Sequence, residues 1–238
     1  MNKINNAIKE LRKGNFILIH DSDRRENETD LAVAAELVTP EHIAKMRMDG
    51  GGLICLAVDR DISERLGLPF MVDIYQSTDN KFPILRYLTP DDIPYDDRSS
   101  FSISINHRET FTGIPDRDRA LTIRRFGEFC KKLPDDARIE FGRKFRSPGH
   151  VRLLISSGIE NREGHTELST ALLKMAGLTP VATICEMLDS NTHRALSRED
   201  AIRYAKKHNL IFLEANEVKE AYVKNPDFYE EDGKNRNS

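Results

Sequence analysis

Apolar runs of strand length alternate with amphipathic segments of helical spacing along most of this chain. The expected strands are the runs at residues 16–20, 31–38, 53–58, 100–105, 151–156, 180–187 and 210–213. The expected helices carry apolar residues three or four positions apart, or begin at a capping residue, at residues 3–13, 40–49, 62–66, 116–132, 166–176, 197–208 and 215–223. Because the two kinds of element interleave, the pattern predicts an α/β protein of the mixed α+β type.

Two segments fit neither pattern. Residues 70–98, which contain three prolines, are expected to form a long irregular segment, and residues 142–150 a basic loop. The chain shows no internal repeat and no Gly/Ser-rich linker. We therefore expect one domain over residues 1–225, followed by a polar C-terminal tail over residues 226–238.

Composition excludes several classes of function. The 36 basic and 39 acidic residues give a formal net charge of −3, which offers no electrostatic case for a nucleic acid or an anionic membrane as partner. The longest apolar runs are far shorter than the roughly 18–20 residues of a membrane span. The three cysteines, Cys55, Cys130 and Cys185, form no CxxC pair, which excludes a closed cysteine-rich zinc site. An odd cysteine count without a signal peptide indicates a reducing, cytoplasmic setting.

An acidic segment, residues 21–30, follows the first predicted strand. Carboxylates stand at positions 21, 23, 26, 28 and 30, with Arg24 and Arg25 among them. Oxygen ligands at this density suit a hard divalent cation such as Mg²⁺ or Mn²⁺. A solvated charged loop would explain the same residues. The position at the end of a buried strand favours a site, because sites of α/β proteins gather at strand ends.

A second segment, Arg162 to Glu167, precedes a predicted helix. Backbone N–H groups at a helix start bind anions, and Arg162 could add a bidentate clamp, so a phosphate would fit there. His165 offers an imidazole to a metal, although no second histidine follows at the spacing of an HExxH zinc site. Ordinary helix capping would explain the same residues.

Two further residues are candidates for acid–base chemistry. His150 follows a Pro-Gly turn and could exchange protons near neutral pH, or it could be an exposed loop histidine. Glu186 ends an apolar strand and could be a base with a raised pKa, or it could pair with an arginine. Cys55 and Cys185 lie within strands and are expected in the core.

Taken together, these segments form an ordered set of motifs: Arg25-Glu26-Asn27-Glu28-Thr29-Asp30, Ser102–Asn106 with Thr112-Gly113-Ile114 and Asp118-Arg119-Ala120, Ser147-Pro148-Gly149-His150, Gly164-His165-Thr166-Glu167, and Cys185-Glu186. With this set the chain resembles the 3,4-dihydroxy-2-butanone 4-phosphate synthase family of riboflavin biosynthesis over roughly residues 5–215. Ser147 and the serine-rich segment after Asp97 are most similar to archaeal members. The length resembles the monofunctional form.

The resemblance implies a lyase that converts D-ribulose 5-phosphate to L-3,4-dihydroxy-2-butanone 4-phosphate and formate. It implies two Mg²⁺ or Mn²⁺ ions per active site. It also implies a single-domain, three-layer α/β sandwich with a mixed sheet, and a homodimer with active sites at the interface, without nucleic acid or membrane partners.

The resemblance also implies roles for individual residues. Glu26 would bind both metal ions and His165 one of them. The catalytic residues would be His150, Glu186 and Asp30. The substrate would be bound by Arg25, Glu26, Asp30, Arg162, Gly164, His165, Thr166 and Glu186. Asp21 and Asp23 fall in the mobile acidic loop of the family, and closure of this loop over substrate is left open.

Two positions depart from the commoner family pattern. Thr29 stands where glycine is usual, and it would restrict the acidic loop if that position needed a positive φ. Glu163 stands where a small or basic residue is usual. Because its charge would be unfavourable at a phosphate pocket, its side chain is expected to point outward.

The implied reaction agrees with the chemistry of the residues. Enolisation of a ketone needs a metal to stabilise the oxyanion and several groups to move protons. Two alternatives stay open. The basic stretch Arg138–Arg152 would suit a nucleotide- or RNA-binding module, although the net charge of −3 argues against it. A metal-dependent phosphatase would release phosphate instead of formate.

Overall fold

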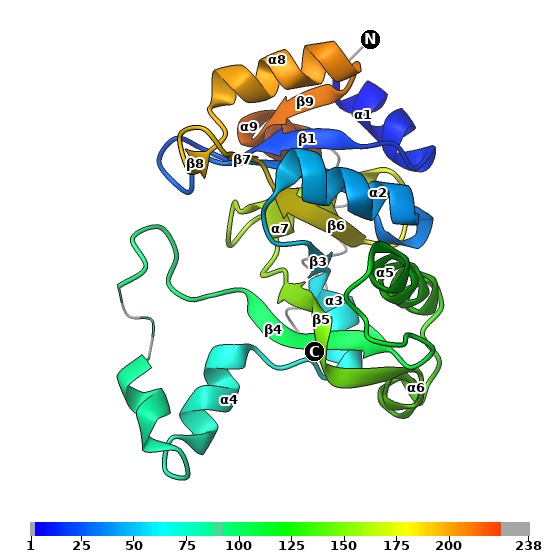
Figure 1. Cartoon of the computed structure of the whole chain (residues 1–238), viewed down its shortest axis with the longest axis vertical. Coiled ribbons are helices and arrows are strands. Elements are labelled where there is room, and N and C mark those ends of the chain that lie inside the picture. Colours follow the sequence, from blue (N-terminus) through cyan, green and yellow to red (C-terminus); the bar gives the residue numbers. More distant parts are fainter. Residues whose placement is uncertain (1–2, 89, 91, 225–238) are drawn as a thin grey trace.

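The computed structural model describes residues 3–88, 90 and 92–224, and a seven-stranded mixed sheet lies at its centre (Figure 1). The strands of this sheet are β1 (Ile17–His20), β2 (Thr29–Ala34), β3 (Cys55–Val58), β4 (Phe101–His107), β5 (Phe145–Ile155), β6 (Val181–Glu186) and β9 (Ile211–Glu214). Their order is β4-β5-β3-β6-β2-β1-β9. The β1–β9 and β3–β5 pairs are parallel, and the other pairs are antiparallel. A separate hairpin joins β7 (Leu188–Asp189) to β8 (Arg194–Ala195).

Helices cover both faces of the sheet. One face packs against α1 (Lys3–Arg12), α7 (His165–Met175) and α9 (Ala215–Val223). The other face packs against α2 (Pro40–Lys45), α3 (Arg60–Leu66), α5 (Asp116–Lys131), α6 (Ala137–Lys144) and α8 (Arg198–His208). Alternate residues of each strand point to opposite layers, so Leu18 joins one core and Ile17 and Ile19 the other. The predicted three-layer α/β sandwich with a mixed sheet is thereby confirmed.

Most predicted elements occur within a few residues of their expected bounds. The predicted strand 31–38 ends early, because β2 stops at Ala34 and a 3₁₀ turn, η1 (Ala35–Leu37), follows it. The helix that begins at Pro40 continues beyond α2 as a short π-helix, η2 (Met46–Gly50). The predicted tail, residues 226–238, lies outside the described residues.

The prediction of an irregular segment over residues 70–98 is wrong for much of its length. This segment contains α4 (Met71–Thr78) and the 3₁₀ helix η3 (Pro83–Leu88), which together form an arm that extends from the body (Figure 1). Neither helix buries a single residue. Without a buried face these helices need no apolar stripe, so the periodicity that marks a packed helix is missing from the sequence.

The prediction of a basic loop over residues 142–150 is also wrong. Helix α6 continues to Lys144, and β5 begins at Phe145. Pro148 lacks an N–H group for the ladder, and the β4–β5 register shifts between Ile105 and Asn106. Prolines are accepted in strands at such irregularities.

Two helical glycines give a matched test of the packing. A Cβ at Gly127 of α5 would lie 2.5 Å from the backbone nitrogen of Glu36, whereas a Cβ at Gly142 of α6 would meet nothing within 4 Å. We expect Gly127→Ala to lower the free energy of unfolding by about 1–3 kcal/mol through overpacking. Gly142→Ala is expected to raise it by about 0.5–1 kcal/mol, because alanine favours the helix. Urea unfolding of both variants checks this, and equal effects would contradict the close packing of α5 on η1.

Candidate active site

The candidate site lies at the ends of two central strands of the sheet, β2 and β6. Asp30 near the start of β2 pairs in register with Glu186 at the end of β6, and the segment between β1 and β2 adjoins both. Helix α7 covers this face and begins at His165. The antiparallel pairing of β1, β2 and β6 therefore brings the acidic segment, Glu186 and the start of α7 to one place.

Asp21 holds the acidic segment in a closed loop. Its side chain is buried, and its two carboxylate oxygens each accept a hydrogen bond of 2.9 Å, from the backbone N–H groups of Glu26 and Glu28. Arg25 also donates to Asp21, at 3.1 Å. Asn27 takes a positive φ of 54° inside the loop. The loop is thus built around one buried carboxylate.

His165 lies between carboxylates. Its Nδ1 is 3.2 Å from Oε2 of Glu26, and its Nε2 is 3.2 Å from the carbonyl oxygen of Glu28 and 3.7 Å from Oδ1 of Asp30. Burial alone would lower the pKa of His165, but the charge of Asp30 and the hydrogen bond to Glu26 outweigh it and raise the pKa to about 10. Burial would raise the pKa of Glu26, yet His165 and Arg25 lower it to about 2.

Because the pKa of His165 is raised, the folding stability of the metal-free protein depends on pH. Because the folded pKa is about 10 and the ordinary value is 6.5, the charged imidazole stabilises the fold fully below about pH 6.5. This contribution is lost as the pH rises through 10. In EDTA, the thermal midpoint of the wild type should therefore fall more steeply over this range than that of His165→Gln. Parallel slopes in circular dichroism melts would contradict the paired histidine.

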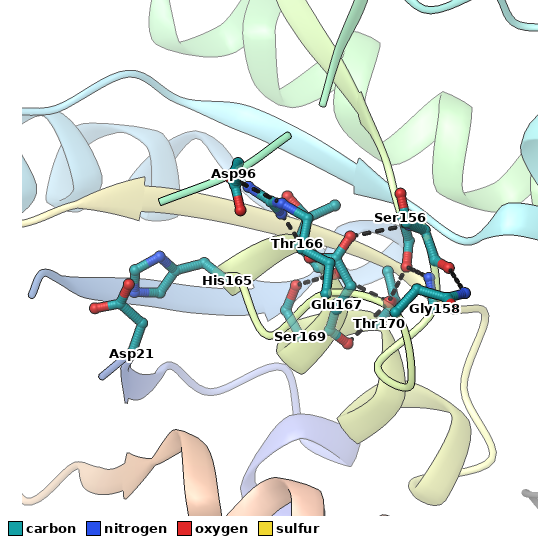
Figure 2. Close-up of polar contacts among 12 residues, drawn as sticks. Asp21, Asp96, Ser156, Gly158, His165, Thr166, Glu167, Ser169 and Thr170 are labelled. Carbon is teal, nitrogen blue, oxygen red and sulfur yellow. Dashed lines mark hydrogen bonds and ion pairs between the residues drawn. The ribbon is translucent and has the colours of Figure 1, made fainter. Parts of the chain in front are cut away.

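Asp21, Glu26 and His165 together could hold a metal ion. One ligand atom from each lies within 4.8 Å of the others, and Figure 2 shows the side chains of Asp21 and His165 facing each other. Two carboxylates with one imidazole suit Mg²⁺ or Mn²⁺. The sequence predicted Glu26 and His165 as metal ligands, and the structure brings these two together and adds Asp21.

Asp30 and Glu186 occupy different environments. Burial raises the pKa of Asp30 well above its ordinary value, although the neighbouring His165 opposes this shift, and Oδ1 of Asp30 accepts no hydrogen bond from the described residues. Glu186 is half-buried, and its Oε2 accepts a hydrogen bond of 2.7 Å from the backbone N–H of Leu53. A Cβ at Gly52 would lie 2.4 Å from that oxygen, which explains the glycine.

The start of α7 lies beside two arginines. Gly164 precedes the helix, and a Cβ there would lie 2.4 Å from Arg162 and 2.9 Å from Arg25. The absent side chain lets both guanidinium groups approach the first turn of the helix, where Thr166 is buried. Arg162 donates to Glu167 at 2.5 Å and to Asp96 at 2.7 and 3.0 Å. These partners were not foreseen, because Arg162 was expected to meet a phosphate directly.

The two departures from the family pattern have simple explanations. Glu163 forms an ion pair with Lys219 of α9. Its side chain therefore has a partner outside the phosphate segment, as expected. Thr29 is the first residue of β2 and has no positive φ, and its hydroxyl lies 2.9 Å from Nδ1 of the buried His20. Threonine thus adds a contact at a position where the backbone does not need glycine.

His150 is not brought to this cluster. It is exposed on β5, where its backbone N–H donates to Oδ1 of Asn106 at 2.8 Å and its Nδ1 lies 3.1 Å from Nδ2 of Asn106. A cavity of about 140 Å³ is instead lined by Glu26, Asp30, Cys55, Ile93, Tyr95, Asp96, Ser99, Ser100, Phe101, Leu154, Arg162, His165, Thr166, Ile184 and Glu186. Within one chain, His150 lies outside this lining.

Asp96 and Tyr95 are the residues that sequence reasoning missed. Oδ2 of Asp96 accepts hydrogen bonds from both Arg25 and Arg162, and the ring of Tyr95 lies 5.4 Å from the Arg25 guanidinium carbon. Both residues fall in the segment that was expected to be irregular, and no periodicity or motif marks them. Cys55 and Cys185 are buried free thiols, as expected, and burial raises the pKa of both.

The fold and the site define a three-layer α/β protein with a carboxylate–imidazole cluster, suited to a divalent cation, at the ends of β2 and β6. The family model of 3,4-dihydroxy-2-butanone 4-phosphate synthase matches residues 5–221, and the chain belongs to this family. Members of the family are enzymes of riboflavin biosynthesis. This confirms the predicted family.

Curated relatives and solved structures agree with this assignment. The synthase of Methanothermobacter thermautotrophicus is 52% identical over 92% of this chain and 96% of its own length. That of Archaeoglobus fulgidus is 48% identical over 92% and 93%. A crystal structure of a synthase in complex with two magnesium ions has a TM-score of 0.73 and 27% identity over 95% of this chain and 99% of its own. The archaeal relatives bear out the predicted archaeal character.

No helix among the described residues has the length and apolarity that a bilayer crossing requires.

Proposed function

We propose that this protein converts D-ribulose 5-phosphate to L-3,4-dihydroxy-2-butanone 4-phosphate and formate, as a lyase that uses two Mg²⁺ or Mn²⁺ ions. The observation that carries this proposal is the cluster of Asp21, Glu26 and His165 beside the start of α7. It unites ligands for a hard cation with a helix start that suits a phosphate. The named activity of the relatives supports the same proposal.

The metal site serves the first chemical step, removal of a proton next to the ketone. Glu26 and His165 would hold a divalent ion, which would supply Lewis-acid stabilisation of negative charge on the substrate oxygens. Two magnesium ions occur in the similar crystal structure, which supports the number proposed here. Asp21 is the additional carboxylate that this chain offers.

The protein side chains divide the proton transfers. Asp30 lines the cavity beside His165, where its carboxyl group can exchange a proton with an oxygen of the substrate. Glu186 is held by the N–H of Leu53 with its carboxylate at the cavity, where it can accept one. Arg25, Arg162, Gly164 and Thr166 surround the start of α7 and would bind the substrate with its phosphate at that helix. Binding of the unreactive phosphate then orients the sugar for reaction.

We further propose a homodimer in which His150 of one protomer completes the cavity of the other. His150 lies outside the cavity of its own chain and is exposed. The nearby Phe111 is 93% exposed, and the arm separately exposes Phe82, Ile84 and Tyr87. Aromatic side chains such as those of Phe111, Phe82 and Tyr87 are enriched at protein interfaces. The cytoplasmic setting stays a prediction.

Formate release from D-ribulose 5-phosphate with Mg²⁺ tests the proposal. Stoichiometric formate that disappears with EDTA and returns with added Mg²⁺ or Mn²⁺ is the expected result. Release of inorganic phosphate in place of formate would identify a metal-dependent phosphatase. Salt-sensitive RNA binding without turnover of the sugar phosphate would identify a binding module.

A further inference from the structure

One carboxylate fastens the two arginines of the candidate site. Oδ2 of Asp96 accepts hydrogen bonds from Arg25 at 2.7 Å and from Arg162 at 2.7 and 3.0 Å. The side chains of Asp96 and Arg25 are only 9% and 8% exposed. Figure 2 shows Asp96 at the start of α7, beside Thr166. Charge-assisted hydrogen bonds of this kind are strong when they are shielded from water.

Asp96 belongs to residues 93–100, here named the strap, which separate two cavities. The inner cavity of about 140 Å³ contains Glu26, Asp30 and His165. An outer groove of about 740 Å³ lies on the other side. The strap residues that line both spaces are Ile93, Tyr95, Asp96, Ser99 and Ser100. Because ligand pockets usually measure about 300–1,000 Å³, the inner cavity is too small for a sugar phosphate until the strap moves.

The C-terminal end of the strap is held differently from its middle. At the C-terminal end, the carbonyl of Ser100 accepts a hydrogen bond from Ile155, and the Arg98 guanidinium stacks 3.6 Å from the centre of the Phe70 ring. The middle is fastened to the site by Asp96 and by the contact of Tyr95 with Arg25. Release of the two arginines would therefore free the middle while the C-terminal anchor stays in place.

A phosphate and the Asp96 carboxylate would compete for the same donors. Arg162 uses Nε and one terminal nitrogen on Asp96 and the other terminal nitrogen on Glu167, so each of its three nitrogens already faces a carboxylate. Two anions close to one another in a shielded site repel each other. A phosphate bound by Arg162 would thus displace Asp96, whereas a neutral ligand would not.

We propose that the strap is an anion-operated gate in which Asp96 is the latch. A phosphate-bearing ligand replaces the Asp96 carboxylate on Arg25 and Arg162. The middle of the strap then moves away from the two arginines, and the inner cavity becomes continuous with the outer groove. This inference rests on the proposed function for the identity of the ligand as a sugar phosphate. It also makes the site selective for ligands that carry a phosphate, because only an anion can exchange with the latch.

Calorimetric titration with inorganic phosphate tests the latch without any turnover. Asp96→Asn keeps the size of the side chain and removes its charge, so phosphate should bind about tenfold more tightly than to the wild type, the usual size of one charged hydrogen-bond effect. Asp97→Asn changes the exposed neighbour in the same strap and should leave the affinity unchanged. Unchanged or weaker phosphate binding by Asp96→Asn, with an unchanged melting temperature, would overturn the proposal.

Hydrogen exchange of the strap amides supplies a second measurement. Phosphate should accelerate exchange within residues 93–98 of the wild type, because the ligand frees the middle of the strap. Protection of those amides by phosphate would overturn the gate. These readouts are separate from formate release. A protein that releases no formate but binds phosphate more tightly as Asp96→Asn would refute the proposed function and keep the latch.

Discussion

Glu26→Gln is expected to abolish nearly all formate release, with a loss of about 10³-fold in kcat/KM. Glu26 belongs to the metal cluster and also forms an ion pair with His165. Glutamine keeps the shape of this side chain but not its charge. Loss of metal-assisted charge stabilisation costs several kcal/mol, and each 1.36 kcal/mol is about tenfold in rate. Steady-state formate assays at saturating Mg²⁺ measure the effect.

Metal binding itself supplies the control for this variant. Titration with Mn²⁺ should show strong binding by the wild type and weak binding by Glu26→Gln. Glu128→Gln, which removes an exposed carboxylate from α5, should match the wild type in both assays. Full activity of Glu26→Gln in the presence of EDTA would refute the metal assignment.

His150→Ala is expected to lower kcat by about 10²–10⁴-fold, the usual range for a group that transfers protons, with little change in KM. The exposed ring of His150 is oriented by Asn106 and is free to enter another protomer. His208→Ala, an exposed histidine on α8, is the matched control and should retain activity. A rise in KM without loss of kcat would show a binding role instead.

Mixing of two inactive variants tests the shared site. His150→Ala and Glu26→Gln protomers, unfolded and refolded together, should regain about a quarter of wild-type activity, because half of the random dimers are heterodimers with one intact site each. Each variant refolded alone should stay inactive. If heterodimers purified through two different tags regain no activity, His150 and Glu26 of the same chain contribute to the same site.

The alternation of strands and helices was readable from the sequence because each buried face repeats with the period of its element. Both faces of β1 and β2 are covered, so these strands appear as continuous apolar runs such as Ile17–Ile19. The arm could not be predicted in the same way, since α4 and η3 pack no side chain into a core. The strand start at Phe145 was hidden by Pro148 and by the irregular β4–β5 pairing.

The site was predictable where its residues lie in short sequence motifs. The side chains of Glu26 and His165 contact each other, as expected, because the β1–β2 connection and the start of α7 lie at the same end of the central strands. The pairing of Arg25 and Arg162 through Asp96 was not predictable, since it joins residues 71 and 66 positions apart and no local pattern marks it. His150 was predicted as a site residue, and within one chain it lies outside the cavity lining.

The closed loop around Asp21 has a thermodynamic consequence for metal binding. Because the Asp21 carboxylate already accepts two backbone N–H groups, the conformational entropy of this loop is lost when the chain folds. An ion bound by Glu26 and His165 would therefore meet a preorganised loop and would not need to order one. Its binding should show only a small heat-capacity change, since little further surface is buried. Folding, and not the metal, sets the shape of the acidic loop.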